Sequence, residues 1–261
     1  MKKVFAFILI LSTAGFPRSF SQSNQEKQEY YQVSIYHFKN EEQKRRIDVY
    51  LEKALLPALH RRQIKNIGVF TPIANDTVPD KKIIVIMPAK SIGQVTTISD
   101  DLTKDQLYQL DAKDFIDAVY NDPPYSRIEK ILLYAFPQSP KLQLPKLNSP
   151  KNERIYEFRS YESPTEKLFR NKVQMFNEGG EVALFKRLNF NAIFYSEVVA
   201  GSQMPNLMYM TSFENMADRD AHWKTFSADP EWKKLSSDPI YQHNVSKADI
   251  VLMRAADYSD Y

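Results

Sequence analysis

Residues 154–161 read RIYEFRSY and are followed directly by ESPTE at residues 162–166. The first segment alternates two kinds of side chain, which predicts a β-strand, because successive strand residues point to opposite faces. In the second segment Ser163 suits a helix N-cap, and Glu166 completes a capping box. A diverged copy of the strand, YYQVSIYHF, stands at residues 30–38. The chain is therefore predicted to be a duplication.

The two copies lie at an offset of about 125 residues, which is too long for a solenoid repeat and indicates a repeated domain. The positions that align are Tyr31 with Tyr156, Tyr36 with Tyr161, Leu59 with Leu184 and Arg62 with Arg187. The predicted strands are residues 30–38, 66–71, 82–87, 128–136, 154–161, 191–199, 207–213 and 249–254. A helix kinked or divided at Pro57 and a helix over residues 103–120 are expected in the first half. The order β-α-β-β-α-β in each half predicts an α+β protein of two tandem ferredoxin-like domains.

The domain boundaries follow from changes in composition. A stretch with four prolines, residues 137–152, is predicted to be a stiff linker, because proline neither pairs within a sheet nor continues a helix. The expected divisions are a signal peptide (1–21), a disordered leader (22–29), an N-terminal domain (30–136), the linker (137–152), a C-terminal domain (153–256) and a tail (257–261).

The first residues predict export. Two lysines precede an apolar run over residues 4–14, and small residues at Ser19 and Ser21 suit a cleavage site. The mature protein is expected to be periplasmic or secreted, without a membrane anchor. It contains no cysteine, which excludes disulfides, thiolate chemistry and a lipid-modified cysteine. The formal charge of +3 falls to near zero without Lys2, Lys3 and Arg18, which argues against nucleic acid as a partner.

The predicted strand at residues 154–161 carries the strongest candidates for chemistry. If Tyr156 and Phe158 face the helices, then Glu157, Arg159 and Tyr161 point into the space between two sheets. One interpretation is a structural ion pair within a filled core. The other is a pocket in which Arg159 holds an anionic or carbonyl oxygen while Tyr161 or Glu157 forms a hydrogen bond or moves a proton.

Two further groups are weaker candidates. The N-terminal copy has Gln32, Ser34 and Tyr36 at the equivalent positions, so both charges are lost and a pocket is expected mainly in the C-terminal half. His222 and Trp223 form a second dense patch, although a histidine on an amphipathic helix is more often a core or cap residue than a ligand. The four histidines show no metal-ligand spacing, so no metal site is predicted.

The C-terminal half resembles the NIPSNAP family, which belongs to the dimeric α/β-barrel superfamily. The motifs that carry the resemblance are RIYEFRSYESP, FNEGGEVALFKRLNFNAIFY and GSQMPNLMYMTSFENMADRDAHWKTFSADPEW, within residues 153–256. The resemblance implies the fold rather than an activity. Related barrels include haem-dependent and cofactor-independent monooxygenases, which hold a ligand between the sheet and its helices, so haem is suggested by this analogy alone and no cofactor is predicted from the residues.

The leading hypothesis is an exported protein that binds a small, partly apolar ligand with an anionic or carbonyl group between sheet and helices. The first alternative is an enzyme of the monooxygenase or isomerase type that uses Tyr161, His222 or Glu157 as acid or base. The second alternative is a structural or assembly module that forms a stable homo-oligomer. The sequence alone assigns no catalytic residue and leaves open whether a reaction is catalysed.

Overall fold

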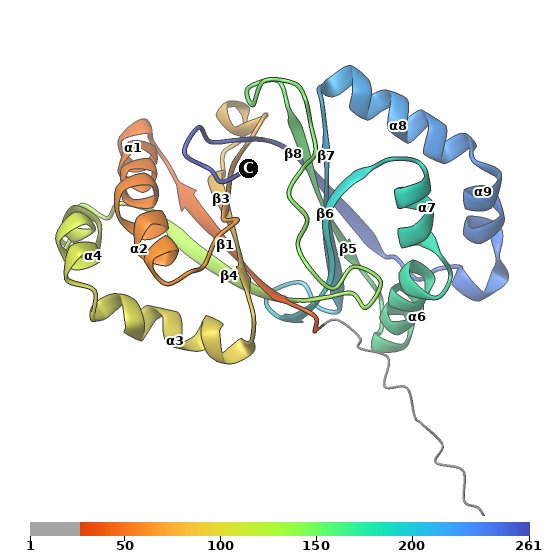
Figure 1. The fold of residues 1–261 in the computed structure, drawn as a ribbon, viewed down its shortest axis with the longest axis horizontal. Coiled ribbons are helices and arrows are strands. Elements are labelled where there is room, and N and C mark those ends of the chain that lie inside the picture. The colour runs from red at the N-terminus through yellow and green to blue at the C-terminus, as the bar shows by residue number, and fades with distance from the viewer. Residues whose placement is uncertain (1–26) are drawn as a thin grey trace, which may run out of the picture.

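Eight antiparallel strands close into one barrel, with helices outside it on two sides (Figure 1). The structure is a computed structural model that describes residues 27–261. The predicted signal peptide and the first part of the predicted leader lie outside the described residues. Within residues 27–261, no helix has the length and apolar character needed to cross a bilayer.

All eight predicted strands are present, and the α+β class is confirmed. The strands are β1 (Tyr30–Phe38), β2 (Gly68–Pro72), β3 (Lys81–Ala89), β4 (Arg127–Ala135), β5 (Ile155–Glu162), β6 (Asn191–Ala200), β7 (Asn206–Phe213) and β8 (Lys247–Ala255). Their order around the barrel is β1-β3-β2-β8-β5-β7-β6-β4. The first half therefore supplies the run β4-β1-β3-β2 and the second half the run β8-β5-β7-β6. Pairing of β2 with β8 and of β4 with β6 closes the barrel.

Each half places its own helices on the outer face of its own strands (Figure 1). The helical elements of the first half are α1 (Glu41–Val49), the π-helix η1 (Tyr50–Leu55), α2 (Leu56–Arg61), the 3₁₀ turn η2 (Asn75–Thr77), α3 (Ile92–Thr103), α4 (Gln106–Asp111) and α5 (Lys113–Ile116). Those of the second half are α6 (Glu166–Asn177), α7 (Glu181–Arg187), α8 (Met216–Ala228), α9 (Pro230–Ser237) and the 3₁₀ turn η3 (Pro239–Tyr241).

The expected disturbance at Pro57 takes the form of a π-helix. Proline has no N–H, so the usual bond from residue 57 to the carbonyl of Lys53 cannot form. Immediately before it, the Leu56 N–H bonds the carbonyl of Leu51, five residues back. The wider turn runs from Tyr50 to Leu55, directly before α2. Such π-helical turns are frequent at functional sites.

Two helix predictions need correction. The cap of α6 is Thr165, whose hydroxyl accepts from the Leu168 N–H at 3.2 Å, whereas the hydroxyl of the predicted cap, Ser163, donates to the Asn244 carbonyl. The predicted helix over residues 103–120 is divided into α4 and α5, and it misses α3, which ends where the prediction begins. Glycine and β-branched residues make α3 a weak helix former in isolation.

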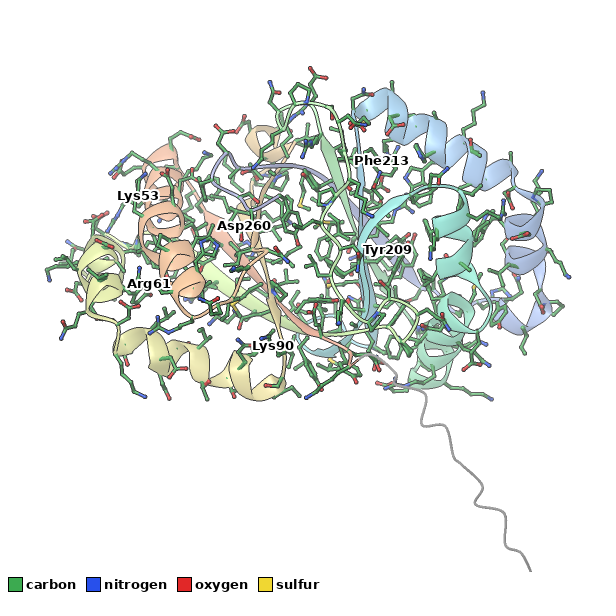
Figure 2. All side chains as sticks on the ribbon, viewed as in Figure 1. Lys53, Arg61, Lys90, Tyr209, Phe213 and Asp260 are labelled. Atoms are coloured by element: carbon green, nitrogen blue, oxygen red, sulfur yellow. The ribbon has the colours of Figure 1, made fainter. Side chains whose placement is uncertain are left out.

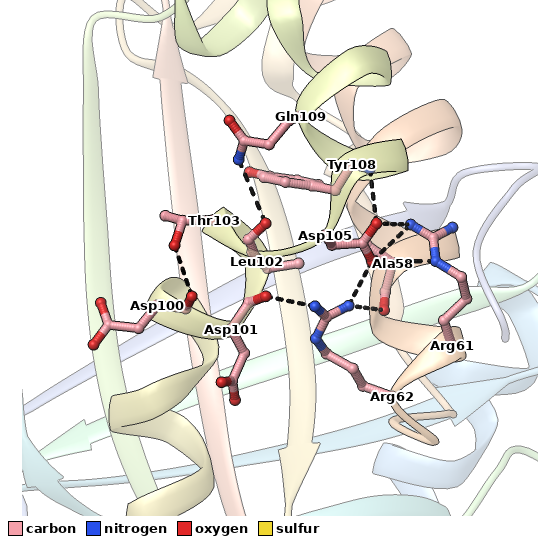
Figure 3. A network of polar contacts seen from close by, with 10 residues as sticks. All are labelled: Ala58, Arg61, Arg62, Asp100, Asp101, Leu102, Thr103, Asp105, Tyr108 and Gln109. Atoms are coloured by element: carbon pink, nitrogen blue, oxygen red, sulfur yellow. Dashed lines mark hydrogen bonds and ion pairs between the residues drawn. The ribbon is translucent and has the colours of Figure 1, made fainter.

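An arginine–aspartate pair recurs in both halves, and its two arginines, Arg62 and Arg187, align in the sequence. In the first half, Arg62 Nη1 lies 2.7 Å from the carboxylate of Asp105, the N-cap of α4 (Figure 3). In the second half, Arg187 Nη2 lies 2.8 Å from the carboxylate of Asp229, the N-cap of α9. Arg61 adds a second guanidinium to the first pair. Each pair ties the end of one helix to the start of another.

The predicted facing of β5 is wrong. Tyr156 and Phe158 point into the barrel, where they join an apolar cluster contributed by strands of both halves. Glu157, Arg159 and Tyr161 point outward, under the helices of the second half. The closed interior is filled by large apolar side chains, whereas the helix layer offers the guanidinium and indole partners that a buried carboxylate requires. Strand alternation separates the two faces without saying which one is inside.

The segment predicted as a linker and the C-terminal tail both lie on the barrel. Residues 137–152 form no helix or strand, and the Gln143 N–H donates to the carbonyl of Ile193 on β6. In the tail, the Asp260 carboxylate accepts from the Ile67 N–H and lies 3.0 Å from His60 Nε2 in the N-terminal half (Figure 2). The ring of Tyr261 is buried in the barrel interior. The last residues of the chain therefore connect the two halves.

Candidate functional site

The outer face of β5 carries a buried carboxylate with three donors. Glu157 is 0% exposed, and its Oε1 contacts both Nε and Nη2 of Arg159. Its Oε2 accepts from Arg219 Nε at 2.6 Å and from Trp223 Nε1 at 2.9 Å. Two guanidinium groups therefore share one buried carboxylate, and Arg219 has Asp220 as a second partner at 2.8 Å.

Helix α8 supplies two of these donors, Arg219 and Trp223, because the residue at which it begins sets which of its faces lies on β5. Its N-cap is Asn215, whose side-chain oxygen accepts from the Asp218 N–H at 3.0 Å. Arg219 and Trp223 follow at a spacing of four residues and so lie on the same helix face. That face lies against Glu157.

A chain of hydroxyl groups continues from the ion pair. Arg159 Nη1 donates to the Tyr161 hydroxyl at 2.8 Å, and this oxygen lies 3.0 Å from the hydroxyl of Tyr209. The guanidinium also stacks 3.6 Å above the Trp223 ring, a favourable cation–π contact. Burial lowers the pKa of Arg159, but Tyr209, Tyr161 and Glu157 raise it more, so the group stays charged. Burial raises the pKa of Tyr209 well above its usual value, so this phenol is neutral at pH 7.

A second buried ion pair completes the charged surface. Lys172 Nζ on α6 lies 2.9 Å from Glu181 Oε2 at the start of α7, and both side chains are buried. Gly180 adopts the left-handed conformation, with a φ of 90°, and lets the chain turn between the two helices. The turn carries Glu181 back beneath Lys172.

These groups surround a cavity of about 370 Å³ between the strands and helices of the second half. It is lined by Arg159, Tyr161, Lys172, Glu181, Phe185, Tyr209, Arg219, Trp223, Phe226, Ser227 and Trp232. Figure 2 labels Tyr209, which reaches the cavity from β7. The lining combines three cations, one carboxylate, two phenols and an aromatic wall. Its size is within the range of small-molecule sites, about 300 to 1,000 Å³.

Three of the six predicted candidates line this cavity, Arg159, Tyr161 and Trp223, and a fourth, Glu157, is bonded to two of them without lining it. His222 lies elsewhere, although it is next to Trp223 in sequence. Its ring packs against Phe190 and Phe213, with centroids 5.3 and 5.6 Å away, and its Nδ1 lies 2.9 Å from the Asp218 carbonyl. His222 is therefore a packing residue. Tyr36 lies on β1, in the helix layer of the other half.

Sequence reasoning missed the charged partners on the helices, which are Arg219, Lys172 and Glu181. No sequence spacing connects them to β5. Tyr209 had a usable signal, because pairing of the two predicted strands sets it directly opposite Arg159 in the observed register.

The lining gives no support to the haem suggested by superfamily analogy. Among the described residues that line this cavity there is no histidine, cysteine or methionine to serve as an axial ligand, and both phenols are hydrogen-bonded to protein groups. Residues 27–261 also contain no cluster of three or more His, Cys, Asp or Glu side chains suited to a metal ion.

Comparisons with known proteins agree with the fold. Residues 156–260 match the NIPSNAP family model, which confirms the resemblance inferred from the C-terminal motifs. No curated protein matches the chain. A "putative monooxygenase" of Lactobacillus acidophilus NCFM is similar at a TM-score of 0.57 and 11% identity, over 88% of this chain and 94% of that one.

Two further solved structures are similar. An anthrone oxidase-like protein gives a TM-score of 0.54 at 8% identity, over 89% of this chain and 93% of that one. A NIPSNAP family protein of Agrobacterium tumefaciens str. C58 is 19% identical over 45% of this chain and 98% of that one, with a TM-score of 0.37. The two long matches show that this chain shares its overall fold with both of those proteins.

Proposed function

We propose that this is an exported binding protein whose C-terminal cavity takes a small, partly apolar molecule with an anionic or carbonyl group. The observation that carries the proposal is the cavity itself, in which three cations and one carboxylate face an aromatic wall. Most ligand pockets combine an apolar lining with a few convergent polar groups. The proposal of export rests on the N-terminal sequence pattern alone.

Arg219 and Lys172 are the donors that a ligand would meet. Arg159 directs its Nε, Nη1 and Nη2 at Glu157 and Tyr161. Arg219 bonds Glu157 through Nε and Asp220 through Nη1, and within the described residues its Nη2 has no hydrogen bond. Lys172 Nζ contacts Glu181 Oε2 and Met175 Sδ, and its ammonium group has a third N–H to offer. We therefore assign Arg159 the task of holding the site together and Arg219 the recognition of the anionic or carbonyl oxygen.

Isothermal titration calorimetry with a naphthoate tests the proposal. We expect the unmodified protein to bind the naphthoate. Ser227→Phe fills the cavity from an exposed position on α8 and should abolish binding. Arg219→Gln should weaken binding about 10- to 100-fold, the value of one charge-assisted hydrogen bond. Lys224→Gln, an exposed change on α8 outside the lining, is the matched control. Failure of the unmodified protein to bind, or equal binding by all variants, would exclude the proposal.

A second candidate function is a monooxygenase-type enzyme, favoured by the names of the fold neighbours and by the phenol pair next to Arg159. Geometry weighs against it. Glu157 is fully buried and bound by three donors, His222 lies outside the cavity, and Tyr161 is bonded on both sides. Oxidation of a quinol that disappears in Tyr161→Phe would favour the enzyme. No oxidation of the quinol by the unmodified protein would favour binding alone.

We also infer that the two halves are copies of one ferredoxin-like unit. Each half supplies four strands in the same relative order, with its first strand between its fourth and third. Tyr31 and Tyr156 both point into the barrel. The aligned Arg62 and Arg187 each pair with an aspartate that caps a helix of the same half. Expression of residues 153–261 alone tests the inference, because an independent unit should give a cooperative unfolding transition, at least as a homodimer.

A further inference from the structure

The N-terminal half contains a cavity of about 370 Å³ on the outer face of its own strands. Gln32, Ser34 and Tyr36 of β1 form one wall, at the positions that align with Glu157, Arg159 and Tyr161. The opposite wall comes from the helices and the residue after α5, and its members include Tyr50, Leu55, Ser99, Tyr108, Ile116 and Asp117. Val85, Met87 and Lys130 complete the lining from β3 and β4. The two halves therefore place cavities at equivalent sites.

The interior of this cavity carries no formal charge. Apart from the tyrosines, two lining residues are ionisable, Asp117 and Lys130. Both are exposed and therefore lie at the rim of the cavity. Where the second half has an ion pair, Gln32 Nε2 donates to Ser34 Oγ at 3.0 Å. The Gln32 carbonyl and the Ser34 O–H remain available as acceptor and donor. An anion would find no cation inside to offset the loss of its hydration.

Three tyrosines supply neutral hydroxyl groups. The Tyr50 and Tyr108 hydroxyls lie 2.9 Å apart, and the Tyr50 ring stacks on Phe115 with centroids 3.9 Å apart. Burial raises the pKa of Tyr36, Tyr50 and Tyr108, so all three are protonated at pH 7. The π-helix η1 presents residues from both of its ends, Tyr50 and Leu55, to the same cavity. The local departure from α-helical geometry thus occurs at the cavity wall.

On the α5 side the rim is exposed and carries one large apolar side chain. Ile116 lines the cavity and is 42% exposed, next to the charged Asp117. Large exposed apolar side chains that adjoin a pocket mark a route for an apolar molecule, because they contact it before it is buried.

We propose that the N-terminal cavity is a second binding site, for an uncharged and mainly apolar aromatic molecule that carries a hydroxyl or carbonyl group. Its oxygen would exchange hydrogen bonds with the phenols of Tyr36 and Tyr50 and with the Gln32–Ser34 pair. Its rings would contact Leu55, which lies on the apolar part of the wall. The two halves of the barrel then select ligands of different charge from equivalent positions.

Titration of the full chain with a naphthol, which is neutral at pH 7, and with the naphthoate of the same ring system separates the two sites. Ser99→Phe fills the N-terminal cavity from an exposed position on α3, and Ser227→Phe fills the C-terminal one. We expect Ser99→Phe to weaken naphthol binding at least tenfold, while Ser227→Phe leaves it within about twofold. Tyr50→Phe, which keeps the ring, should weaken naphthol binding about fivefold through the loss of one hydrogen bond.

The naphthoate titration is read separately and reports on the C-terminal cavity alone. Absence of naphthol binding to the unmodified protein would overturn the second site. Naphthol binding that Ser227→Phe abolishes and Ser99→Phe leaves intact would overturn it as well, because the probe would then occupy the C-terminal cavity. Circular dichroism of each variant establishes that the barrel is intact before the affinities are compared.

Discussion

Replacing Glu157 with glutamine should lower the free energy of unfolding by about 3 kcal/mol. The carboxylate is fully buried and receives hydrogen bonds from Arg159, Arg219 and Trp223. Glutamine keeps the shape and one oxygen, but it removes the carboxylate charge that both guanidinium groups share, and Arg159 is left without a carboxylate partner. One of its N–H groups would also point at a guanidinium donor.

The magnitude follows from the exposure of the two cations. Breaking a buried ion pair costs about 3 to 5 kcal/mol when the remaining charge stays unpaired and buried. The Arg159 side chain is 11% exposed, so its rehydration is limited. The Arg219 side chain is 21% exposed and has Asp220 as a second partner, which favours the lower end of the range. For a protein of this size the loss corresponds to a fall in Tm of about 6 to 12 °C.

Urea unfolding followed by circular dichroism and by tryptophan fluorescence measures the effect. Trp223 and Trp232 are the only tryptophans in the sequence, and both line the C-terminal cavity, so fluorescence reports on this half. Glu153→Gln, at an exposed position just before β5, is the matched control and should change stability by less than about 0.5 kcal/mol. A loss below about 1 kcal/mol in Glu157→Gln would refute the assignment of Glu157 as the buried counter-ion.

Two further predictions concern stability. The hydrogen bond from Arg62 first, and then those from backbone and other groups, hold the pKa of Asp105 well below its usual range. The contribution of this carboxylate to stability is therefore present above about pH 4 and is lost as the pH falls through the folded-state pKa. The urea midpoints of Asp105→Asn and the unmodified protein should differ at pH 7 and converge toward pH 2. Gly179→Ala would place a Cβ 2.6 Å from a backbone carbonyl oxygen of α6 and should lower Tm. Gly93→Ala, in α3, would place a Cβ no closer than 3.7 Å to any neighbouring atom and should raise the free energy of unfolding by about 0.4 to 1 kcal/mol. Equal thermal shifts in the two variants would contradict this expectation.

The strands were predictable because their signal is local. Alternation and turn residues located all eight, and β1 has the predicted bounds, Tyr30–Phe38. Helix α3 was missed because its pattern is weak, with Ile98 and Leu102 as its buried residues. Its stability comes from packing on the sheet rather than from its own composition.

The candidate site was predictable only in part, for a topological reason. The row Glu157, Arg159 and Tyr161 is local and was found, but its direction depends on which strand face becomes the inside of the barrel. Closure into a barrel fills the inner face with apolar side chains from all around the sheet. Arg219 and Lys172 come from helices that pack only after this closure, so no sequence pattern links them to β5.

Comparison of the two halves indicates whether Glu157 and Arg159 are needed for the fold. In the N-terminal half, the same position under the helices is occupied by Gln32 and Ser34, and the half still folds around an intact helix-layer core. The fold of one half therefore does not require a buried ion pair at this position. In other proteins, replacement of both partners of a buried ion pair by uncharged residues is often neutral for stability. Glu157→Gln alone should lower the free energy of unfolding, because it leaves Arg159 buried without a carboxylate partner. Glu157→Gln combined with Arg159→Ser reproduces the residues of the N-terminal half and should restore most of that free energy. If that double variant is stable and no longer binds the naphthoate, the charges serve the ligand rather than the fold.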